Sequence, residues 1–266
     1  MRLGFLMYRH PPSRRSPIVP EVVRLLEKWH CHVDLLLPDE HPINLATLRP
    51  EADLYVLKSG TEAALSVAGA LHTGGARTVN PYPVTALCRD KIMTTRVLQE
   101  AGILVPETWV TTQPLELAPM LDDGPLVLKP VRGSQGRGVT VVRRPDELAH
   151  APAEMVIAQR WRQPDGPDRK MYCIGGQVFG VERGFPARTF EEKVGRPLRV
   201  DSQLRDLVLR CGAALGLDLF GLDVIEHGGA RYVVDFSSFP GFKGVPNAAL
   251  RLADHLYHAA RQAAAA

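Results

Sequence analysis

Short apolar runs alternate with amphipathic stretches along the first third of the chain. The apolar runs predict strands at residues 3–8, 33–37 and 54–57, with a short strand near 78–79. Between them, apolar residues recur at helical spacing, which predicts helices at 19–29 and 61–71. Strands that alternate with helices form parallel sheets. The sequence therefore predicts an open α/β domain with a parallel sheet over residues 1–86.

From residue 87 onward, strands and turns dominate the pattern. A helix is predicted at 91–100, where Asp90 and Lys91 open the helical pattern and Gly102 follows it. A second helix is predicted at 202–215, ending at Gly216. The strands expected here are 108–111, 126–129, 139–142, 155–159, 170–174, 178–182, 220–226 and 231–235. The fold class is therefore α/β, becoming α+β toward the C-terminal part, with three parts over residues 1–86, 87–158 and 159–266.

Composition excludes several classes of protein. The chain has 266 residues, of which 45% are hydrophobic, so it can build a sizeable core. Its 32 basic and 29 acidic residues leave a net charge of +3, which is too balanced to predict a nucleic acid partner. No apolar run predicts a membrane partner, and the four cysteines are widely separated. We expect a cytoplasmic protein with reduced thiols. A homo-oligomer is left open, because no stretch marks an interface.

Basic side chains follow the first and third predicted strands. Ligands of open α/β sheets sit beyond the carboxyl ends of the strands. The residues at those positions are Arg9, His10, Arg14, Arg15, Lys58 and Ser59. They either bind an acidic substrate or are solvated loop residues.

A glycine-rich loop lies between two of the predicted strands. Residues 127–142 read as an apolar run that ends in Lys129, a loop with three glycines and two arginines, and a second β-branched run. Glycine lets backbone N–H groups approach phosphate oxygens without a side chain in the way. The loop is not a P-loop or a dinucleotide fingerprint, because its glycines precede a strand and not a helix. It is either a phosphate-binding loop or an ordinary hairpin loop.

The last predicted hairpin carries one aspartate on each strand. Antiparallel pairing would bring Asp223 and Asp235 close together, and two neighbouring carboxylates repel each other unless a cation neutralises them. Magnesium does so with few protein carboxylates, while water and phosphate oxygens complete its shell. The alternative is that one aspartate faces solvent or caps a turn. Together with a phosphate loop upstream, the pair favours a magnesium site.

The order of these motifs resembles the ATP-grasp proteins, and most of all the RimK-type amino-acid ligases and the inositol trisphosphate kinases. The resemblance covers essentially the whole chain. It implies an ATP-grasp fold with an N-terminal open parallel-sheet domain, a lid that carries the glycine loop, and a C-terminal part that carries the metal ligands. ATP would lie between the last two parts.

The resemblance implies roles for the nucleotide-binding residues one by one. Lys91, in Arg89-Asp90-Lys91, matches the lysine that opens the ATP-grasp region and reaches phosphate. Lys129, in Leu128-Lys129-Pro130, matches the lid-strand lysine that contacts the nucleotide. The loop over the β- and γ-phosphates is matched by Gly133, Ser134, Gln135, Gly136, Arg137 and Gly138. The hinge whose backbone recognises adenine is matched by Gln159, Arg160 and Trp161.

The resemblance also implies the catalytic and metal residues. Lys170 and Arg183 match basic residues near the triphosphate. The metal positions, for Mg²⁺ or Mn²⁺, are matched by Asp223, Asp235 and Ser237, followed by residues 239–242. Ser237 stands where the family usually has asparagine, and Arg160 stands where the hinge usually has glutamate. The Arg-x-Asn element of RimK-type ligases is not evident around residues 187–189, so the amine site stays unassigned.

The activity that the resemblance implies is ATP- and magnesium-dependent ligation of a carboxylate to an amine. The carboxylate would first become an acyl phosphate, which the lid protects from water before the amine attacks. The substrates would be a small acid and an amine, with a peptide as one option. The alternatives are a kinase acting on a small polyol or inositol phosphate, and an inactive ATP-binding regulatory module, for which Ser237 is the hint.

Overall fold

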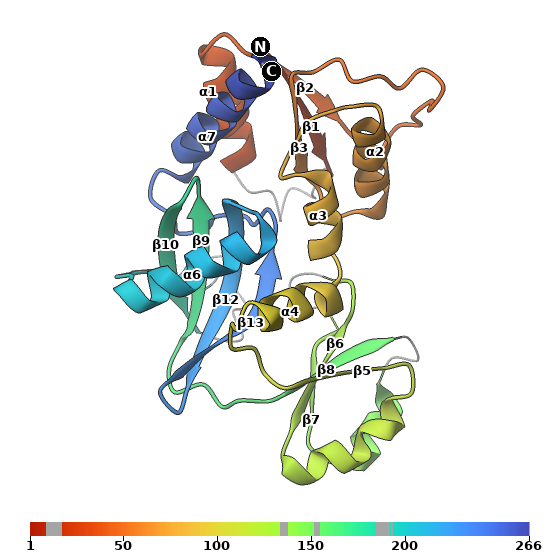
Figure 1. Ribbon diagram of the computed structural model, residues 1–266, viewed down its shortest axis with the longest axis vertical. Coiled ribbons are helices and arrows are strands. Elements are labelled where there is room, and N and C mark those ends of the chain that lie inside the picture. The colour runs from red at the N-terminus through yellow and green to blue at the C-terminus, as the bar shows by residue number, and fades with distance from the viewer. Residues whose placement is uncertain (9–17, 134–137, 152–154, 185–191, 193, 266) are drawn as a thin grey trace.

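A computed structural model describes residues 1–8, 18–133, 138–151, 155–184, 192 and 194–265. Figure 1 shows three sheets arranged along the long axis, with the N-terminal sheet at one end and a small sheet at the other. The prediction of mixed helix and strand structure is confirmed for these residues. No helix of the described chain is long and apolar enough to cross a membrane.

The N-terminal sheet is parallel, as predicted. Its strands are β1 (Arg2–Met7), β2 (His32–Leu36), β3 (Leu54–Lys58) and β4 (Thr78–Val79), in the order β2-β1-β3-β4. Along β3, Leu54 and Val56 face one core, while Tyr55 and Leu57 face another. Both faces of the sheet are therefore covered by helices, which explains the nearly unbroken apolar runs in its strands.

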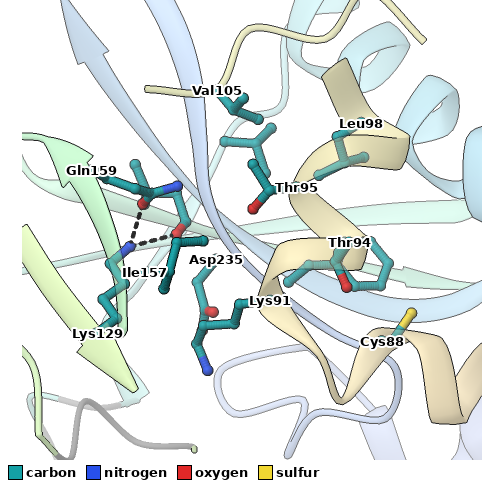
Figure 2. Close-up of a pocket in the computed structure, with 13 residues that line it drawn as sticks. Cys88, Lys91, Thr94, Thr95, Leu98, Val105, Lys129, Ile157, Gln159 and Asp235 are labelled. Carbon is teal, nitrogen blue, oxygen red and sulfur yellow. Dashed lines mark hydrogen bonds between the residues drawn. The ribbon is translucent and has the colours of Figure 1, made fainter. Parts of the chain in front are cut away.

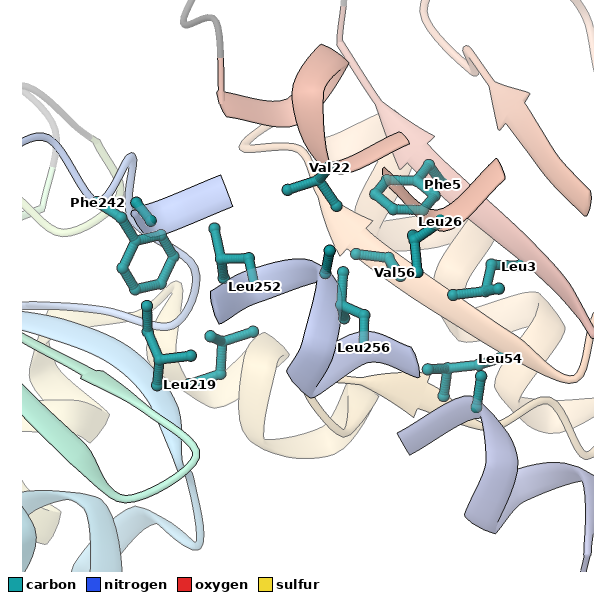
Figure 3. Packing of buried hydrophobic residues seen from close by; sticks show 14 of the residues in the cluster. Leu3, Phe5, Val22, Leu26, Leu54, Val56, Leu219, Phe242, Leu252 and Leu256 are labelled. Carbon is teal, nitrogen blue, oxygen red and sulfur yellow. The ribbon is translucent and has the colours of Figure 1, made fainter. Parts of the chain in front are cut away.

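The two faces of this sheet are covered by helices from opposite ends of the chain. Helices α2 (Glu62–Thr73) and α3 (Tyr82–Cys88) lie on one side, and α1 (Ile18–Lys28) lies on the other together with α7 (Ala248–Ala264). Leu252 and Leu256 of α7 pack between the N-terminal strands and Leu219 of the C-terminal sheet, as Figure 3 shows. Helix α7 therefore joins the N-terminal core to the C-terminal core.

The small sheet, called the lid sheet below, is antiparallel. It contains β5 (Thr108–Thr111), β6 (Leu126–Pro130), β7 (Thr140–Val142) and β8 (Val156–Arg160), in the order β5-β8-β6-β7. Two 3-10 segments, η2 (Pro114–Asp123) and η3 (Pro145–His150), cover its core. The pattern predicted no helix at η2, which has prolines at its first and sixth positions.

The C-terminal sheet contains five strands in the order β11-β10-β9-β12-β13, all paired antiparallel. The strands are β9 (Asp168–Ile174), β10 (Gln177–Arg183), β11 (Arg196–Leu198), β12 (Leu219–His227) and β13 (Ala230–Ser237). Helices α4 (Lys91–Glu100) and α6 (Ser202–Leu215) pack on one face of it. Helix α6 ends at Gly216, whose left-handed φ of 65° favours glycine, as predicted.

Three segments pack against elements that belong to a different predicted part of the chain. Helix α4, predicted within part 87–158, packs on α6 and β13. Strand β8 pairs with the lid strands through Arg160. Helix α7, predicted within part 159–266, covers the N-terminal sheet. Each of these helices buries its apolar face on the nearest uncovered sheet, whatever its place in the sequence. The two boundaries between the three parts stay a prediction.

Candidate functional site

A group of charged side chains lies on the face of the C-terminal sheet opposite α6. Asp223 on β12 is directly opposite Lys170 on β9. The Lys170 Nζ donates to Asp223 Oδ2 at 3.0 Å, and the Arg183 Nη2 donates to Asp223 Oδ1 at 2.9 Å. Each carboxylate oxygen therefore holds one cation. The three side chains are mostly buried, so each charge is neutralised by its neighbours and not by water.

Asp168 belongs to the same group, although the sequence analysis did not single it out. It is the first residue of β9, two positions before Lys170, and it pairs with Arg183 across the strands. Burial raises the pKa of Asp168, the negative charge of Asp223 raises it further, and Arg183 and Lys170 oppose both effects. The period of two along a strand was the available signal, because it places residues 168 and 170 on one face.

Asp235 and Ser237 complete the predicted metal positions on β13. Asp223 and Asp235 are directly opposite in the register, which confirms the predicted pairing of the two strands, and Ser237 is opposite Gly221. A register shift follows Asp223, since Val224 pairs with Val233. Among the described residues, the Asp235 carboxylate has no hydrogen-bond or ion-pair partner.

The oxygen donors at these positions fit a magnesium ion that takes most of its ligands from water and phosphate. Within the described chain, no three His, Cys, Asp or Glu side chains form a metal-binding group. Magnesium does not need such a group, because one or two carboxylates suffice when a nucleotide supplies oxygens. Asp235 has its oxygens available, and Asp223 has further lone pairs beside those that accept from Lys170 and Arg183.

Lys129 connects the lid sheet to the C-terminal sheet. Its Nζ donates to Gln159 Oε1 at 2.6 Å and to the carbonyl of Val234 on β13 at 2.9 Å. Burial lowers the pKa of Lys129, as does the charge of Lys91, while Asp235 and Asp223 oppose the change. Figure 2 shows Lys129 and Lys91 beside Asp235 in one pocket. Two lysines from different elements thus lie next to an unpaired carboxylate.

The pocket lies between α4, the lid sheet and β13. Apolar side chains line one side of it, among them Leu98, Val105 and Ile157, and the charged groups line the other. Its enclosed volume is about 30 Å³. Such a volume holds about one water molecule, so a larger ligand enters only when the lid sheet or the lining side chains move.

The start of the glycine-rich loop is held by the first turn of α4. Asp90 caps this helix through bonds to two backbone N–H groups, as predicted. The Lys91 Nζ donates to the Gly133 carbonyl at 2.8 Å. At the other end of the loop, Gly138 has a φ of 70°, a conformation that side chains rarely adopt. Ser134, Gln135, Gly136 and Arg137 lie outside the described residues.

Arg160, which stands where the hinge usually has glutamate, has a structural task. Its buried guanidinium donates to the carbonyls of Met120 at 2.7 Å and Gly124 at 2.6 Å. It also lies over the ring of Trp109, 5.0 Å from the ring centroid. The side chain therefore holds the η2 segment against the lid sheet and is not directed toward a ligand.

The hinge backbone is also partly engaged. The N–H of Arg160 donates to the Glu107 carbonyl at 2.8 Å, and the N–H of Trp161 donates to the Pro125 carbonyl at 2.9 Å. Gln159 is buried and uses its side-chain oxygen for Lys129. Recognition of a base by this segment therefore has to use carbonyl oxygens or the N–H of a later residue.

The N-terminal sheet brings one further predicted cation to the same region. Lys58, the last residue of β3, donates to the carbonyls of Phe239 at 2.8 Å and Pro240 at 3.0 Å, just after Ser237. Ser59 instead bonds to Thr61, near the start of α2. Arg9, His10, Arg14 and Arg15, predicted for the same edge, lie outside the described residues.

Comparisons with known proteins show which family and which enzymes this chain resembles. The family model described as the RimK-like ATP-grasp domain matches residues 88–258. The glutamate–LysW ligase ArgX of Sulfolobus acidocaldarius is 25% identical over 243 residues, covering 84% of this chain and 86% of that protein. The ribosomal protein bS6–L-glutamate ligase of Escherichia coli is 23% identical over 244 residues, covering 84% and 81%. A structure of the ATP-grasp ligase PsnB with minimal precursor, Mg and ADP has a TM-score of 0.69 at 18% identity, covering 98% of each chain.

Proposed function

Since this chain belongs to the family of RimK-like ATP-grasp domains, we propose that it joins a carboxylate to an amine in the cleft between its lid sheet and its C-terminal sheet. The expected ATP-grasp fold and ATP-dependent ligase activity are confirmed, and neither the kinase nor the inactive module is favoured. The observation that supports this cleft as the active site is the hydrogen bond from Lys129 to β13, next to the Asp223–Asp235 pair.

The first chemical step is transfer of the γ-phosphoryl group of ATP to a carboxylate oxygen. Negative charge develops on that group during transfer, and preorganised cations stabilise it. Lys91 and Lys129 approach the cleft from α4 and the lid sheet, while Lys170 and Arg183 approach from the C-terminal sheet. The carboxylate becomes an acyl phosphate and ADP is the leaving group.

Asp223, Asp235 and Ser237 are the residues that would hold magnesium. When bound, the ion neutralises charge on the phosphate oxygens. Ser237 has a shorter side chain than the usual asparagine, so a water molecule would bridge its hydroxyl to the ion. Ligases of this family use ATP and magnesium; preference for magnesium over manganese is our proposal.

The second step is attack of an amine on the acyl phosphate, which forms the amide and releases phosphate. Acyl phosphates hydrolyse in water, so the lid sheet has to close over the cleft before this step. The hydrogen bond from Lys129 on β6 to the Val234 carbonyl on β13 joins the lid sheet to the C-terminal sheet.

The relatives suggest the class of substrates. Two curated relatives are named for joining glutamate to a protein. We propose an amino acid as the amine, and a small acid or the carboxylate of a peptide as the acceptor. The cytoplasmic location and the question of a homo-oligomer stay predictions.

Phosphate release and product mass, measured across a panel of acids and amino acids, test the proposal. A ligase releases phosphate only when both substrates are present, and the product mass equals the two substrates less one water. Hydroxylamine in place of the amine should give a hydroxamate with the correct acid, because it traps acyl phosphates. Transfer of phosphate to an alcohol, or ATP binding without any product across the panel, would contradict the proposed function.

A further inference from the structure

Lys58 is a half-buried cation that no carboxylate of the described chain neutralises. Its two hydrogen bonds go to backbone carbonyls, those of Phe239 and Pro240, and its Nζ lies 4.8 Å from the centroid of the Phe239 ring. Burial lowers the pKa of Lys58 to about 8. A buried charge without a counter-ion costs folding free energy, and such residues are typical of functional sites. An ammonium group has three N–H donors, so one remains for a ligand.

The position of Lys58 connects it to the reacting end of the cleft. Phe239 and Pro240 follow Ser237 by two and three residues, so the ammonium lies against the segment that leaves the proposed metal strand. Lys58 is also at the carboxyl end of β3, the edge at which open α/β sheets bind ligands. The residue therefore lies where the N-terminal sheet meets the segment that follows β13.

Arg89 extends this positive region toward α4. Its guanidinium donates to the Gly60 carbonyl, two residues after Lys58, and its side chain is 23% exposed. Its Nε is buried and has no hydrogen-bond partner. Glu62 is 3.8 Å away, and it also pairs with Arg132 at 3.2 Å. One exposed carboxylate thus faces two guanidinium groups, so Glu62 neutralises only part of their positive charge.

An acid substrate needs such a region. The carboxylate has to approach the γ-phosphate of ATP, and the two anions repel each other unless cations lie beside them. Four cations would face the phosphates from α4, the lid sheet and the C-terminal sheet, namely Lys91, Lys129, Lys170 and Arg183. Lys58 and Arg89 are on the remaining side, toward the N-terminal sheet. An uncharged polyol would not need these charges, so the region favours an anionic acceptor such as an acid.

The geometry assigns Lys58, with Arg89 beside it, as the binding site for the carboxylate of the acid substrate. This assignment rests on the proposed ligase function. In the step it serves, a carboxylate oxygen forms a bond to the γ-phosphorus and the bond from that phosphorus to the bridging oxygen of ADP breaks. No proton is transferred. Lys58 remains protonated and holds the carboxylate while the new bond forms.

The test is Lys58→Met, which keeps the length of the side chain and removes its charge. Hydroxamate formation is measured with ATP, hydroxylamine and the acid that supports phosphate release by the wild type. Because no amine substrate is present, this assay reports on the acid alone. We expect the KM for the acid to rise by about ten- to a hundred-fold, since a hydrogen bond to a charged group is lost. The Kd of ATP should not change.

Lys28→Met, at an exposed position of α1, is the matched control and should leave both constants unchanged. Melting curves and ATP binding show whether Lys58→Met folds, and Lys58→Arg should retain most of the acid affinity. If Lys58→Met does not fold, Arg89→Met is held to the same criteria.

Two results would overturn the assignment. One is an unchanged KM for the acid in a folded variant. The other, seen when phosphate release is measured with the amine substrate in place of hydroxylamine, is a rise in the KM for the amine alone, which would place the carboxylate of the amine substrate at Lys58. Failure of the wild type to form hydroxamate with any acid would instead refute the proposed function itself.

Discussion

The two aspartates that face each other across β12 and β13 should respond differently to the same substitution. Asp223 neutralises Lys170 and Arg183, whereas Asp235 has no ion-pair partner among the described residues. In Asp223→Asn, the neutral amide leaves two mostly buried cations with only the Asp168 carboxylate nearby. In Asp235→Asn, no ion pair is lost. We therefore expect only the first variant to lose substantial stability.

The magnitude follows from burial. The Asp223, Lys170 and Arg183 side chains are 15%, 11% and 22% exposed, so water screens them only weakly. Removing one partner of a buried ion pair costs about 3–5 kcal/mol, and partial exposure places this case near about 3 kcal/mol. In a chain of this size, that corresponds to a fall in Tm of roughly 6–12 °C. Asp235→Asn should change the unfolding free energy by less than about 1 kcal/mol.

Thermal melts and urea titrations of both variants, without nucleotide at pH 7, measure the difference. Both variants should lose ligase activity, because both remove a proposed magnesium ligand. Equal losses of stability in the two variants, or wild-type stability in Asp223→Asn, would refute the reasoning. Full activity in Asp235→Asn would remove that residue from the metal positions.

Three further predictions concern other parts of the molecule. Lys129→Met should raise the Kd of ATP by about ten- to a hundred-fold, because a half-buried cation that we propose contacts the phosphates is lost. An unchanged Kd in a fluorescent-nucleotide titration would contradict its assignment. Ser237→Asn should raise the affinity for magnesium, since an amide oxygen reaches farther than a hydroxyl. Calorimetry with a nonhydrolysable nucleotide present measures this affinity, and a fall in affinity would mean that the hydroxyl has a role of its own. Bonds from Arg231 and the N-terminus of α6 lower the pKa of Asp201 from 3.8 to about 2. A carboxyl group whose pKa is lower in the folded state than in the unfolded state stabilises the fold at any pH above its unfolded pKa. The wild type should therefore be more stable than Asp201→Asn above pH 3.8 and should lose that advantage as the pH falls toward about 2. If acid denaturation curves show a stability difference between the two proteins that does not change with pH, the prediction is wrong.

The elements predicted best from sequence are those whose signals are local. Helix α6 has Asp201 as its cap and Gly216 at its end, and the structure has its bounds at the predicted residues. The last hairpin has alternating residues and a glycine turn, so the pairing of its two strands followed from the pattern, whereas the register shift that sets Asp223 opposite Asp235 did not. Both features depend on residues that are close together in the chain.

The features that the sequence did not reveal depend on distant contacts. Nothing in residues 248–264 indicates that helix α7 covers the N-terminal sheet. Lys58 bonds to residues 181 and 182 positions away, which no pattern could predict. Arg160 occupies the position of the family's hinge residue, but its residue type differs from the usual glutamate. Its side chain turned out to hold the lid core, because the η2 segment supplies two carbonyls.

The placement of α7 has a consequence for the order in which the protein can mature on the ribosome. The strands β1 and β3 are made first, yet Leu3, Phe5 and Val56 gain part of their cover only from Leu252 and Leu256. A nascent chain that lacks residues 248–264 exposes this apolar face, which invites aggregation. The first-made sheet therefore cannot reach its final stability until the last helix has emerged, and chaperones have a defined surface to shield until then.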